Sequence, residues 1–220
     1  MSMFDFKGAW TALVTPFRPD DSLDIDGLKQ NIEFQIREGI TGLLPVGTTG
    51  ESPNLNWDEH NAVIEQTVQT INGRTPVIAG VGSNNTAEAV RAAKHAQEIG
   101  ATVGLLVDCY YNGPSSLELR TRYYEAVAKA APNFPLVPYV IPGRSGCELS
   151  EIDVAILSEN PQFVAVKEAT GNLDRMRRER SLVADGFSIM SGDDDLTATM
   201  MTDAAIRASG VISVMSNICP

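Results

Sequence analysis

The sequence predicts an α/β fold in which eight parallel strands alternate with helices, a (β/α)8 or TIM barrel. Short apolar runs of strand length alternate along the chain with longer runs whose apolar residues recur at helical spacing. Unusual polar residues and glycines follow several of the apolar runs, where such barrels place their active sites. A doubly wound open sheet is the alternative, but it would usually carry a glycine-rich phosphate loop after its first strand. The residues at that position are Thr15-Pro16-Phe17, which do not form such a loop.

Eight segments have the length and apolar content of buried strands. They are 9–14, 42–46, 76–81, 102–107, 136–141, 163–168, 187–190 and 210–215. Helices are predicted at 24–38, at 56–71, around the alanines of 89–96, and at 116–130. Pro138 is the weak point of this assignment, because proline removes a backbone donor from the middle of a strand.

Composition limits the possible classes of protein. The 220 residues are 43% hydrophobic and 20% charged, which suits one globular domain with a sizeable core. The net charge of −11 argues against nucleic acid as a partner and against adhesion to anionic membranes. No run of 18 apolar residues and no signal-peptide pattern occurs. A cytoplasmic protein is therefore expected.

Few residues are available for metal or disulfide chemistry. Cys109, Cys147 and Cys219 are too few and too scattered for a disulfide framework or a zinc site. The two histidines, His60 and His95, leave little room for a histidine-based metal site or catalytic triad. No metal is expected.

One lysine, Lys167, is the principal candidate for chemistry. It lies at the end of a strand-like run, and alternation places Phe163, Ala165 and Lys167 on one face, with Val164, Val166 and Glu168 on the other. Such a lysine can extend to solvent or pair with Glu168. It can equally be a desolvated amine whose lowered pKa allows it to attack a carbonyl group as a Schiff-base nucleophile.

Other candidates follow the neighbouring strands. Gly47-Thr48-Thr49-Gly50-Glu51 is an ordinary turn or a backbone cradle for a carboxylate. Tyr139 is a core ring or a proton shuttle, and Arg144 is a solvated loop residue or a carboxylate clamp. Tyr110-Tyr111-Asn112 is a rim cluster or an interface patch. Asp193-Asp194-Asp195 fits a helix N-terminus better than a metal site, because adjacent aspartates point in different directions.

Taken together, these segments carry a resemblance that covers nearly the whole chain in order. The sequence resembles the dihydrodipicolinate synthase family, within the pyruvate-dependent aldolase superfamily that also includes N-acetylneuraminate lyase. The matching segments are GTTGES at 47–52, YYN at 110–112, Tyr139 with Arg144-Ser145-Gly146, VKEATGNL at 166–173, SGDD at 191–194 and GVISV at 210–214. Tyr111 and Arg144 together favour the synthase over the lyase.

The resemblance implies a lyase that condenses pyruvate with L-aspartate 4-semialdehyde to give 4-hydroxy-tetrahydrodipicolinate, in the diaminopimelate route to lysine. Lys167 would form the Schiff base without a metal or organic cofactor. The resemblance also implies that Tyr139 is the proton shuttle and that it is linked through Thr48 to Tyr111 of a neighbouring subunit. Thr48 and Thr49 would hold the pyruvate carboxylate, and Arg144 would bind the carboxylate of the semialdehyde. Gly192 and Ile212 would line the pocket.

The same resemblance implies assembly and regulation. The family suggests a homotetramer built as a dimer of dimers. The residues that match its lysine feedback site at the dimer interface are Ser52, His60, Asn84, Glu88 and Tyr110, while Trp57 replaces a histidine common there.

Three departures from the family pattern leave alternatives open. Val140 stands where the family usually has asparagine, Pro138 precedes Tyr139, and two extra residues lie between Tyr111 and Tyr139. Another pyruvate-dependent aldolase or dehydratase, acting on 2-keto-3-deoxy sugar acids, is the second hypothesis. A catalytically inactive barrel that serves as a binding protein is the third.

The chain is expected to form a single barrel domain over 1–220 that is incomplete at its C-terminal end. Only five residues follow the strand predicted at 210–215. A (β/α)8 barrel needs an eighth helix to cover its last and first strands, and typical barrels have about 250 residues. Neither that helix nor the family's C-terminal helices have a counterpart in the sequence.

Overall fold

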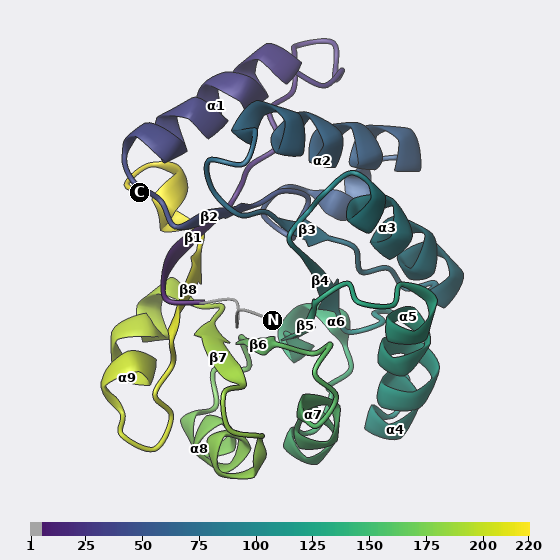
Figure 1. Cartoon of the computed structure of the whole chain (residues 1–220), viewed down its shortest axis with the longest axis vertical. Coiled ribbons are helices and arrows are strands. Elements are labelled where there is room, and N and C mark those ends of the chain that lie inside the picture. The colour runs from purple at the N-terminus through teal and green to yellow at the C-terminus, as the bar shows by residue number, and fades with distance from the viewer. Residues whose placement is uncertain (1–5) are drawn as a thin grey trace.

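The structure, a computed structural model, describes residues 6–220. One sheet of eight parallel strands runs in the order β2-β1-β8-β7-β6-β5-β4-β3. A parallel bridge from Leu43 in β2 to Val77, beside β3, joins the two ends of that order. The helices surround the sheet on its outer side (Figure 1). The predicted (β/α)8 barrel is confirmed.

The strands lie within or close to the predicted segments. They are β1 (Gly8–Ala12), β2 (Gly42–Leu44), β3 (Ile78–Gly80), β4 (Val103–Val107), β5 (Leu136–Val140), β6 (Ala165–Glu168), β7 (Ser188–Ser191) and β8 (Gly210–Ser213). The helices are α1 (Ile25–Arg37), α2 (Trp57–Ile71), α3 (Thr86–Glu98), α4 (Ser116–Glu118), α5 (Glu125–Ala130), α6 (Pro142–Ser145), α7 (Glu151–Ser158), α8 (Leu173–Leu182) and α9 (Thr197–Thr202).

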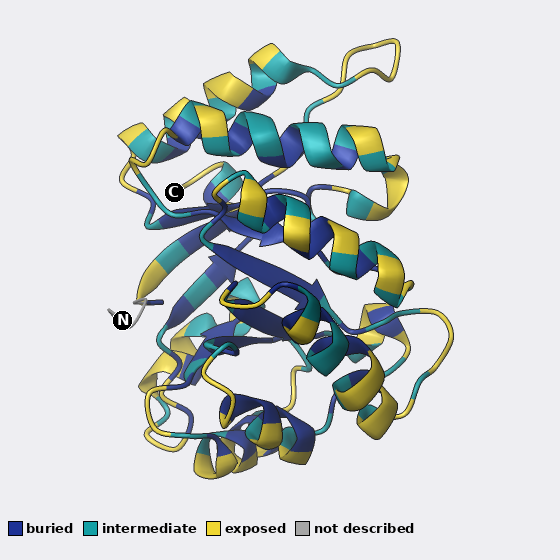
Figure 2. Cartoon of the chain, turned by 45° about the vertical axis from the view of Figure 1, so that its right-hand side comes forward, coloured by how far each residue is buried: buried dark blue, intermediate teal, exposed yellow. Residues whose placement is uncertain are grey.

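Helix starts follow from side-chain caps. Asp24 accepts the N–H of Gly27 at the start of α1, and Asn56 forms a capping box with Glu59 at the start of α2. Helix α3 turns a face of alanines inward, which lets it lie close to the barrel. In Figure 2 the strands are mostly buried, and the helices show both buried and exposed residues along their length.

The barrel interior is filled by inward-pointing side chains from every strand. Because successive residues of a strand point to opposite faces, each strand supplies both this interior and the layer beneath the helices. The buried interior cluster consists of Phe6, Trp10, Ala12, Leu44, Ile78, Val103, Leu105, Val137, Tyr139, Ala165, Met190 and Ile212.

Pro138 lies inside β5, opposite an irregularity in the pairing with the next strand. Leu136 is bridged to Phe163, whereas Tyr139 is paired with Lys167. The partners therefore differ by 27 positions at Leu136 and by 28 at Tyr139, so the chain leading into β6 carries one extra residue. Such a bulge accommodates a residue that has no N–H to donate.

The bulge also corrects the predicted alternation. Ala165 belongs to the interior cluster, whereas Phe163 packs in the outer layer and Val164 against the interior. The prediction that Phe163 shares a face with Ala165, and Val164 with Val166, was wrong, because an inserted residue reverses the faces of everything on one side of it. Lys167, on the far side of the bulge, shares the interior face with Ala165 as predicted.

The predicted helix at 116–130 is interrupted by a π-helical segment, η2 (Leu119–Tyr124), between α4 and α5. The wider turn places two buried tyrosines against the end of β4. Tyr123 donates a hydrogen bond to the carbonyl of Val107, and Tyr124 to the carboxylate of Asp108. A regular helical pattern does not reveal such a segment.

The chain after β8 packs onto β1 and α1. It forms a short 3-10 helix, η4 (Met215–Asn217), and the described residues contain no α-helix beyond β8. Asn217 donates to the carbonyl of Ala12, and Gln35 of α1 donates to the carbonyl of Ser216.

Within residues 6–220, no helix is long and apolar enough to cross a membrane.

The fit between Gly42 and Trp10 gives a test of the barrel interior. A Cβ added to Gly42 would lie 2.2 Å from the indole ring of Trp10, which is fully buried. We expect Gly42→Ala to lower the free energy of unfolding by about 1–3 kcal/mol, the usual cost of overpacking. Urea titration followed by tryptophan fluorescence measures it. Gly143→Ala, where a Cβ would meet nothing within 4 Å, is the control; equal effects of both changes would contradict the packing argument.

Candidate active site

Lys167 is an interior lysine at the carboxyl end of β6. Its side chain is only 5% exposed, and its Nζ lies 4.0 Å from the centroid of the Tyr139 ring. Burial lowers the pKa of the amine from 10.5 to about 7, while the charge of Asp194 partly opposes that shift. A large share of the amine is therefore uncharged near neutral pH and has the lone pair that attack on a carbonyl requires.

Tyr139 is placed beside the lysine by the pairing of β5 with β6. Its pKa is raised mainly by burial, and a side-chain hydrogen bond from Thr48 and the positive charge of Arg144 act in the opposite direction. The phenol therefore keeps its proton near neutral pH and has a hydroxyl neighbour. A protonated phenol next to a neutral amine can supply or accept a proton during addition to a carbonyl group.

The loop after β7 lies against the lysine side chain. A Cβ on Gly192 would lie 3.0 Å from Cε of Lys167, so glycine at this position leaves room for the amine. Asp193 caps the 3-10 helix η3 (Asp194–Leu196) by accepting the N–H of Asp195, which confirms the helix-terminus interpretation of the three aspartates. Ile212 of β8 is 1% exposed and belongs to the interior cluster.

The remaining predicted site residues lie on the rim. Thr48 is exposed and Thr49 half-buried in the loop after β2, and Arg144 is exposed on α6 after β5. The structure therefore brings Lys167, Tyr139 and Gly192 into direct contact, and brings Thr48 and Arg144 to Tyr139.

Tyr111 is not part of this group in the single chain. Its side chain is 87% exposed, and its backbone has a φ of 78°, in the left-handed region that non-glycine residues rarely adopt. The N–H of Tyr111 donates to the carbonyl of Ser145, which attaches this residue to the segment carrying Arg144.

Glu168 does not pair with Lys167, contrary to one of the two interpretations of the sequence. Its carboxylate is fully buried on the outer face of β6 and accepts hydrogen bonds from the N–H of Thr170 and from Nε of Arg175. Arg175, Glu179 and Asp108 complete a buried charged network there, which sequence reasoning missed. Its only signal was Glu168, a carboxylate within an apolar strand.

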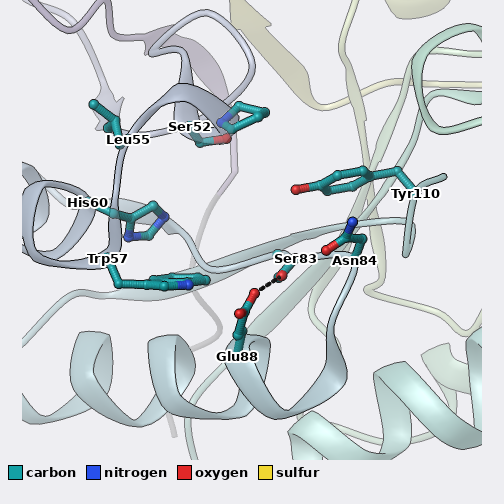
Figure 3. A pocket seen from close by; sticks show the side chains of 10 residues that line it. Ser52, Leu55, Trp57, His60, Ser83, Asn84, Glu88 and Tyr110 are labelled. Atoms are coloured by element: carbon teal, nitrogen blue, oxygen red, sulfur yellow. Dashed lines mark hydrogen bonds between the residues drawn. The ribbon is translucent and has the colours of Figure 1, made fainter.

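Away from Lys167, a cavity of about 120 Å³ lies beside the loop that carries Tyr110. Figure 3 shows Trp57 and His60 on one side, Tyr110 and Asn84 on the other, and Glu88 bonded to Ser83. The structure thus brings together all six residues predicted for regulation. The residues lining the cavity are Ser52, Pro53, Leu55, Trp57, His60, Gly82, Ser83, Asn84, Glu88 and Tyr110.

The cavity has the electrostatics of a site for a cation. Burial lowers the pKa of His60 to about 4, so its imidazole is neutral near neutral pH, and its buried Nδ1 has no hydrogen-bond partner. The Trp57 ring lies 4.7 Å from the His60 ring, and the Glu88 carboxylate faces the same space. Aromatic faces and a carboxylate favour an ammonium group.

Comparison with known proteins gives consistent results. The sequence pattern of the dihydrodipicolinate synthetase family matches residues 5–220. A 4-hydroxy-tetrahydrodipicolinate synthase of Methanothrix thermoacetophila is 44% identical over 216 residues, which are 98% of this chain and 71% of the relative. The crystal structure of dihydrodipicolinate synthase from Aquifex aeolicus superposes with a TM-score of 0.92 at 41% identity, covering 97% of this chain and 71% of that one.

Two similar solved structures contain ligands. The enzyme of Acinetobacter baumannii, complexed with pyruvate, has a TM-score of 0.92 and 37% identity over 97% of this chain and 72% of its own. The enzyme of Cyanidioschyzon merolae, with lysine bound, has a TM-score of 0.91 and 35% identity over 96% of this chain and 71% of its own. With a family match along almost its whole length and relatives above 40% identity, the chain belongs to the dihydrodipicolinate synthetase family.

Proposed function

We propose that this chain is a 4-hydroxy-tetrahydrodipicolinate synthase, a lyase that condenses pyruvate with L-aspartate 4-semialdehyde through a Schiff base on Lys167. The observation that carries the proposal is the buried amine of Lys167, with a pKa of about 7, beside the Tyr139 ring in a member of this family. The names of the curated relatives favour the synthase over an aldolase for 2-keto-3-deoxy sugar acids. A reactive amine argues against a barrel that only binds.

The first half of the reaction uses the amine and the phenol. The neutral Lys167 amine attacks the ketone of pyruvate, the carbonyl oxygen leaves as water, and a C=N bond forms. This oxygen takes up two protons, one that passes from the attacking nitrogen and one from Tyr139. The iminium then draws electrons from the pyruvate methyl group, which loses a proton to the deprotonated Tyr139 and gives an enamine. Thr48 and Thr49 hold the pyruvate carboxylate through the loop after β2.

The second half joins the two substrates. The enamine carbon bonds to the aldehyde carbon of the semialdehyde, and the aldehyde oxygen takes a proton from Tyr139. The amino group of the joined product then attacks the imine carbon, closes the ring and releases Lys167 as an amine. Arg144, exposed on the rim close enough to act on the charge of Tyr139, binds the carboxylate of the semialdehyde.

Assembly completes the site. Tyr111 extends into solvent from a left-handed backbone position, the arrangement expected of a side chain that reaches a neighbouring subunit. We place it in the proton relay of that neighbour, within a homotetramer built as a dimer of dimers.

The three cysteines are all free, which supports a reducing cytoplasm as the location.

We assign regulation to the cavity lined by Trp57, His60 and Glu88, and infer that it binds lysine. Its carboxylate, neutral imidazole and aromatic rings suit an ammonium group, and a similar enzyme has been solved with lysine bound. Tyr110 lines this cavity and Tyr111 follows it directly, so a ligand there can alter the relay through one peptide unit.

Trapping with borohydride tests the nucleophile. Reduction in the presence of pyruvate is expected to add one pyruvate to the peptide that contains Lys167, as seen by mass spectrometry. Lys167→Ala should remove the adduct and nearly all activity, and Lys167→Arg should not restore them, because a guanidinium group stays protonated in proteins. An undiminished adduct in the alanine variant would reject the assignment.

The pH dependence of trapping follows from the lowered pKa. Below pH 7 most of the Lys167 amine is protonated and cannot attack, so capture with cyanoborohydride should fall about tenfold per pH unit. Above pH 7 the rate should level off, since the amine is then mostly neutral. A rate that keeps rising up to pH 10, as for an exposed lysine, would contradict the desolvation of this amine.

Arg144→Ala separates the two substrates. Loss of a charge-assisted pair costs about 1.5–3 kcal/mol, which should appear as a raised KM for the semialdehyde. The yield of trapped pyruvate should stay close to wild type, because Lys167 and Tyr139 are untouched. Steady-state kinetics with each substrate varied in turn measure the difference. Normal semialdehyde kinetics would assign its carboxylate to another residue.

Lysine titration tests the regulatory cavity. We expect millimolar lysine to inhibit the enzyme, and calorimetry to show binding that Glu88→Gln weakens about tenfold or more, because the ammonium group loses its carboxylate. Glu98→Gln, on the same helix as Glu88 but outside the cavity lining, is the control. Absence of both inhibition and binding at millimolar lysine would reject this regulatory role.

A further inference from the structure

A buried arginine, Arg175, lies on the outer side of the barrel directly behind the active site. It belongs to α8 and is 3% exposed. A guanidinium group presents its donors in a fixed planar fork and stays charged, so burying it is costly unless carboxylates pair with it. Burial opposes the charge, but the neighbouring carboxylates of Glu168, Glu179 and Glu148 raise the pKa of Arg175 overall.

The donors of Arg175 reach two different parts of the active-site rim. Nε donates to the carboxylate of Glu168 at 3.3 Å, and Glu168 directly follows Lys167 on β6. Nη2 donates to the backbone carbonyl of Leu149 at 2.7 Å, and Leu149 ends the segment that begins after β5 and carries Arg144. One side chain therefore connects the strand of the lysine with the segment of the rim arginine.

The same peptide segment is held from its other side. The N–H of Leu149 donates to Oδ2 of Asp108 at 3.1 Å, and the hydroxyl of Tyr124 donates to Oδ1 of Asp108 at 2.5 Å. Leu149 and Asp108 are both fully buried. Leu149 thus has its N–H fixed to the end of β4 and its carbonyl fixed to Arg175, which leaves the end of the Arg144 segment little freedom.

Glu179 adds a further carboxyl group to this buried network. It is fully buried, and burial together with the charge of Glu168 raises its pKa well above the usual value. Its Oε2 accepts a hydrogen bond from Nη2 of Arg175 at 3.4 Å. Glu148 and Glu151 reach Arg175 from the partly exposed side.

We propose that Arg175 is a positioning residue, which holds the end of β6 with Lys167 and the segment with Arg144 in one fixed relation through Glu168 and Leu149. The inference rests on the proposed roles of Lys167 and Arg144. Lys167 itself is also held by Tyr139 and Gly192 inside the barrel. On its C-terminal side the Arg144 segment is also held by the hydrogen bonds of Cys147 to the carbonyl of Cys109 and of the N–H of Leu149 to Asp108. Arg175 is the side chain that joins this segment to Glu168 on β6, so the position of the semialdehyde site relative to Lys167 is the part that depends on Arg175.

Arg175→Lys is the test, because lysine keeps the charge but lacks the planar fork whose separate nitrogens reach Glu168 and Leu149. We expect KM for the semialdehyde to rise about tenfold, equivalent to about 1.4 kcal/mol. KM for pyruvate and the trapped adduct on Lys167 should stay within about twofold of wild type. Amide hydrogen exchange over 144–149 should quicken.

Glu151→Gln is the matched control. It removes the charge of a carboxylate that lies 3.1 Å from Nη1 of Arg175, and it leaves the bonds of Arg175 to Glu168 and Leu149 in place.

The outcomes separate positioning from general stability and from the proposed function. Equal semialdehyde KM in Arg175→Lys and Glu151→Gln, or a loss that affects both substrates equally, would overturn the proposal. If Arg175→Lys does not fold, the charge-balanced double variant Glu168→Gln/Arg175→Gln replaces it with the same expected result, and failure of both to fold would assign Arg175 to stability alone. If the wild-type protein forms no pyruvate adduct, the proposed function fails, while hydrogen exchange still tests the hold on 144–149.

Discussion

The removal of one amine from water is the constraint on which the site depends. Lys167 points into the barrel interior, which is filled largely by a cluster of apolar and aromatic side chains. An ammonium group there would lose its hydration without a close carboxylate partner, so the equilibrium moves toward the neutral amine. The cost of burying the lysine and its ability to attack a carbonyl group therefore have the same origin. A barrel with a gap between two strands would admit water. It would then reduce both the cost of burying the lysine and the share of neutral amine.

The two faces of β6 have opposite electrostatic characters. Lys167 faces an interior without a bonded carboxylate, whereas Glu168 faces a layer with a buried arginine and several carboxyl groups. Keeping the anion on the outer face prevents an ion pair that would restore the ordinary pKa of the lysine. Strand geometry makes this separation possible, because adjacent residues point to opposite sides. The backbone of β6 thus separates the amine of Lys167 from the charged groups around Glu168 on the outer face.

The sequence was sufficient for the fold class, the strands and the shared face of Ala165 and Lys167, because alternation and strand length are local signals. It failed for Phe163 and Val164, since the bulge opposite Pro138 reverses their faces, and a bulge is a property of two paired strands. The network around Arg175 was missed because its members, from Asp108 to Glu179, come together only when three strand ends and two helices pack. Most predicted site residues were locatable because family motifs carry them. The role proposed for Tyr111 in a neighbouring subunit concerns an assembly that a single chain does not contain.

The π-helical segment at Leu119–Tyr124 has a consequence for how this chain tolerates changes of length. A π turn takes up one more residue than an α turn, since each N–H bonds to the carbonyl five residues earlier. An added residue can therefore widen one turn of the helix without lengthening it, so the ends of the helix keep their positions against β4 and β5. This segment lies in the stretch between Tyr111 and Tyr139, where two extra residues relative to the family pattern are predicted from the sequence. Insertion and deletion can thus occur in the helical layer without sliding the catalytic strands past one another.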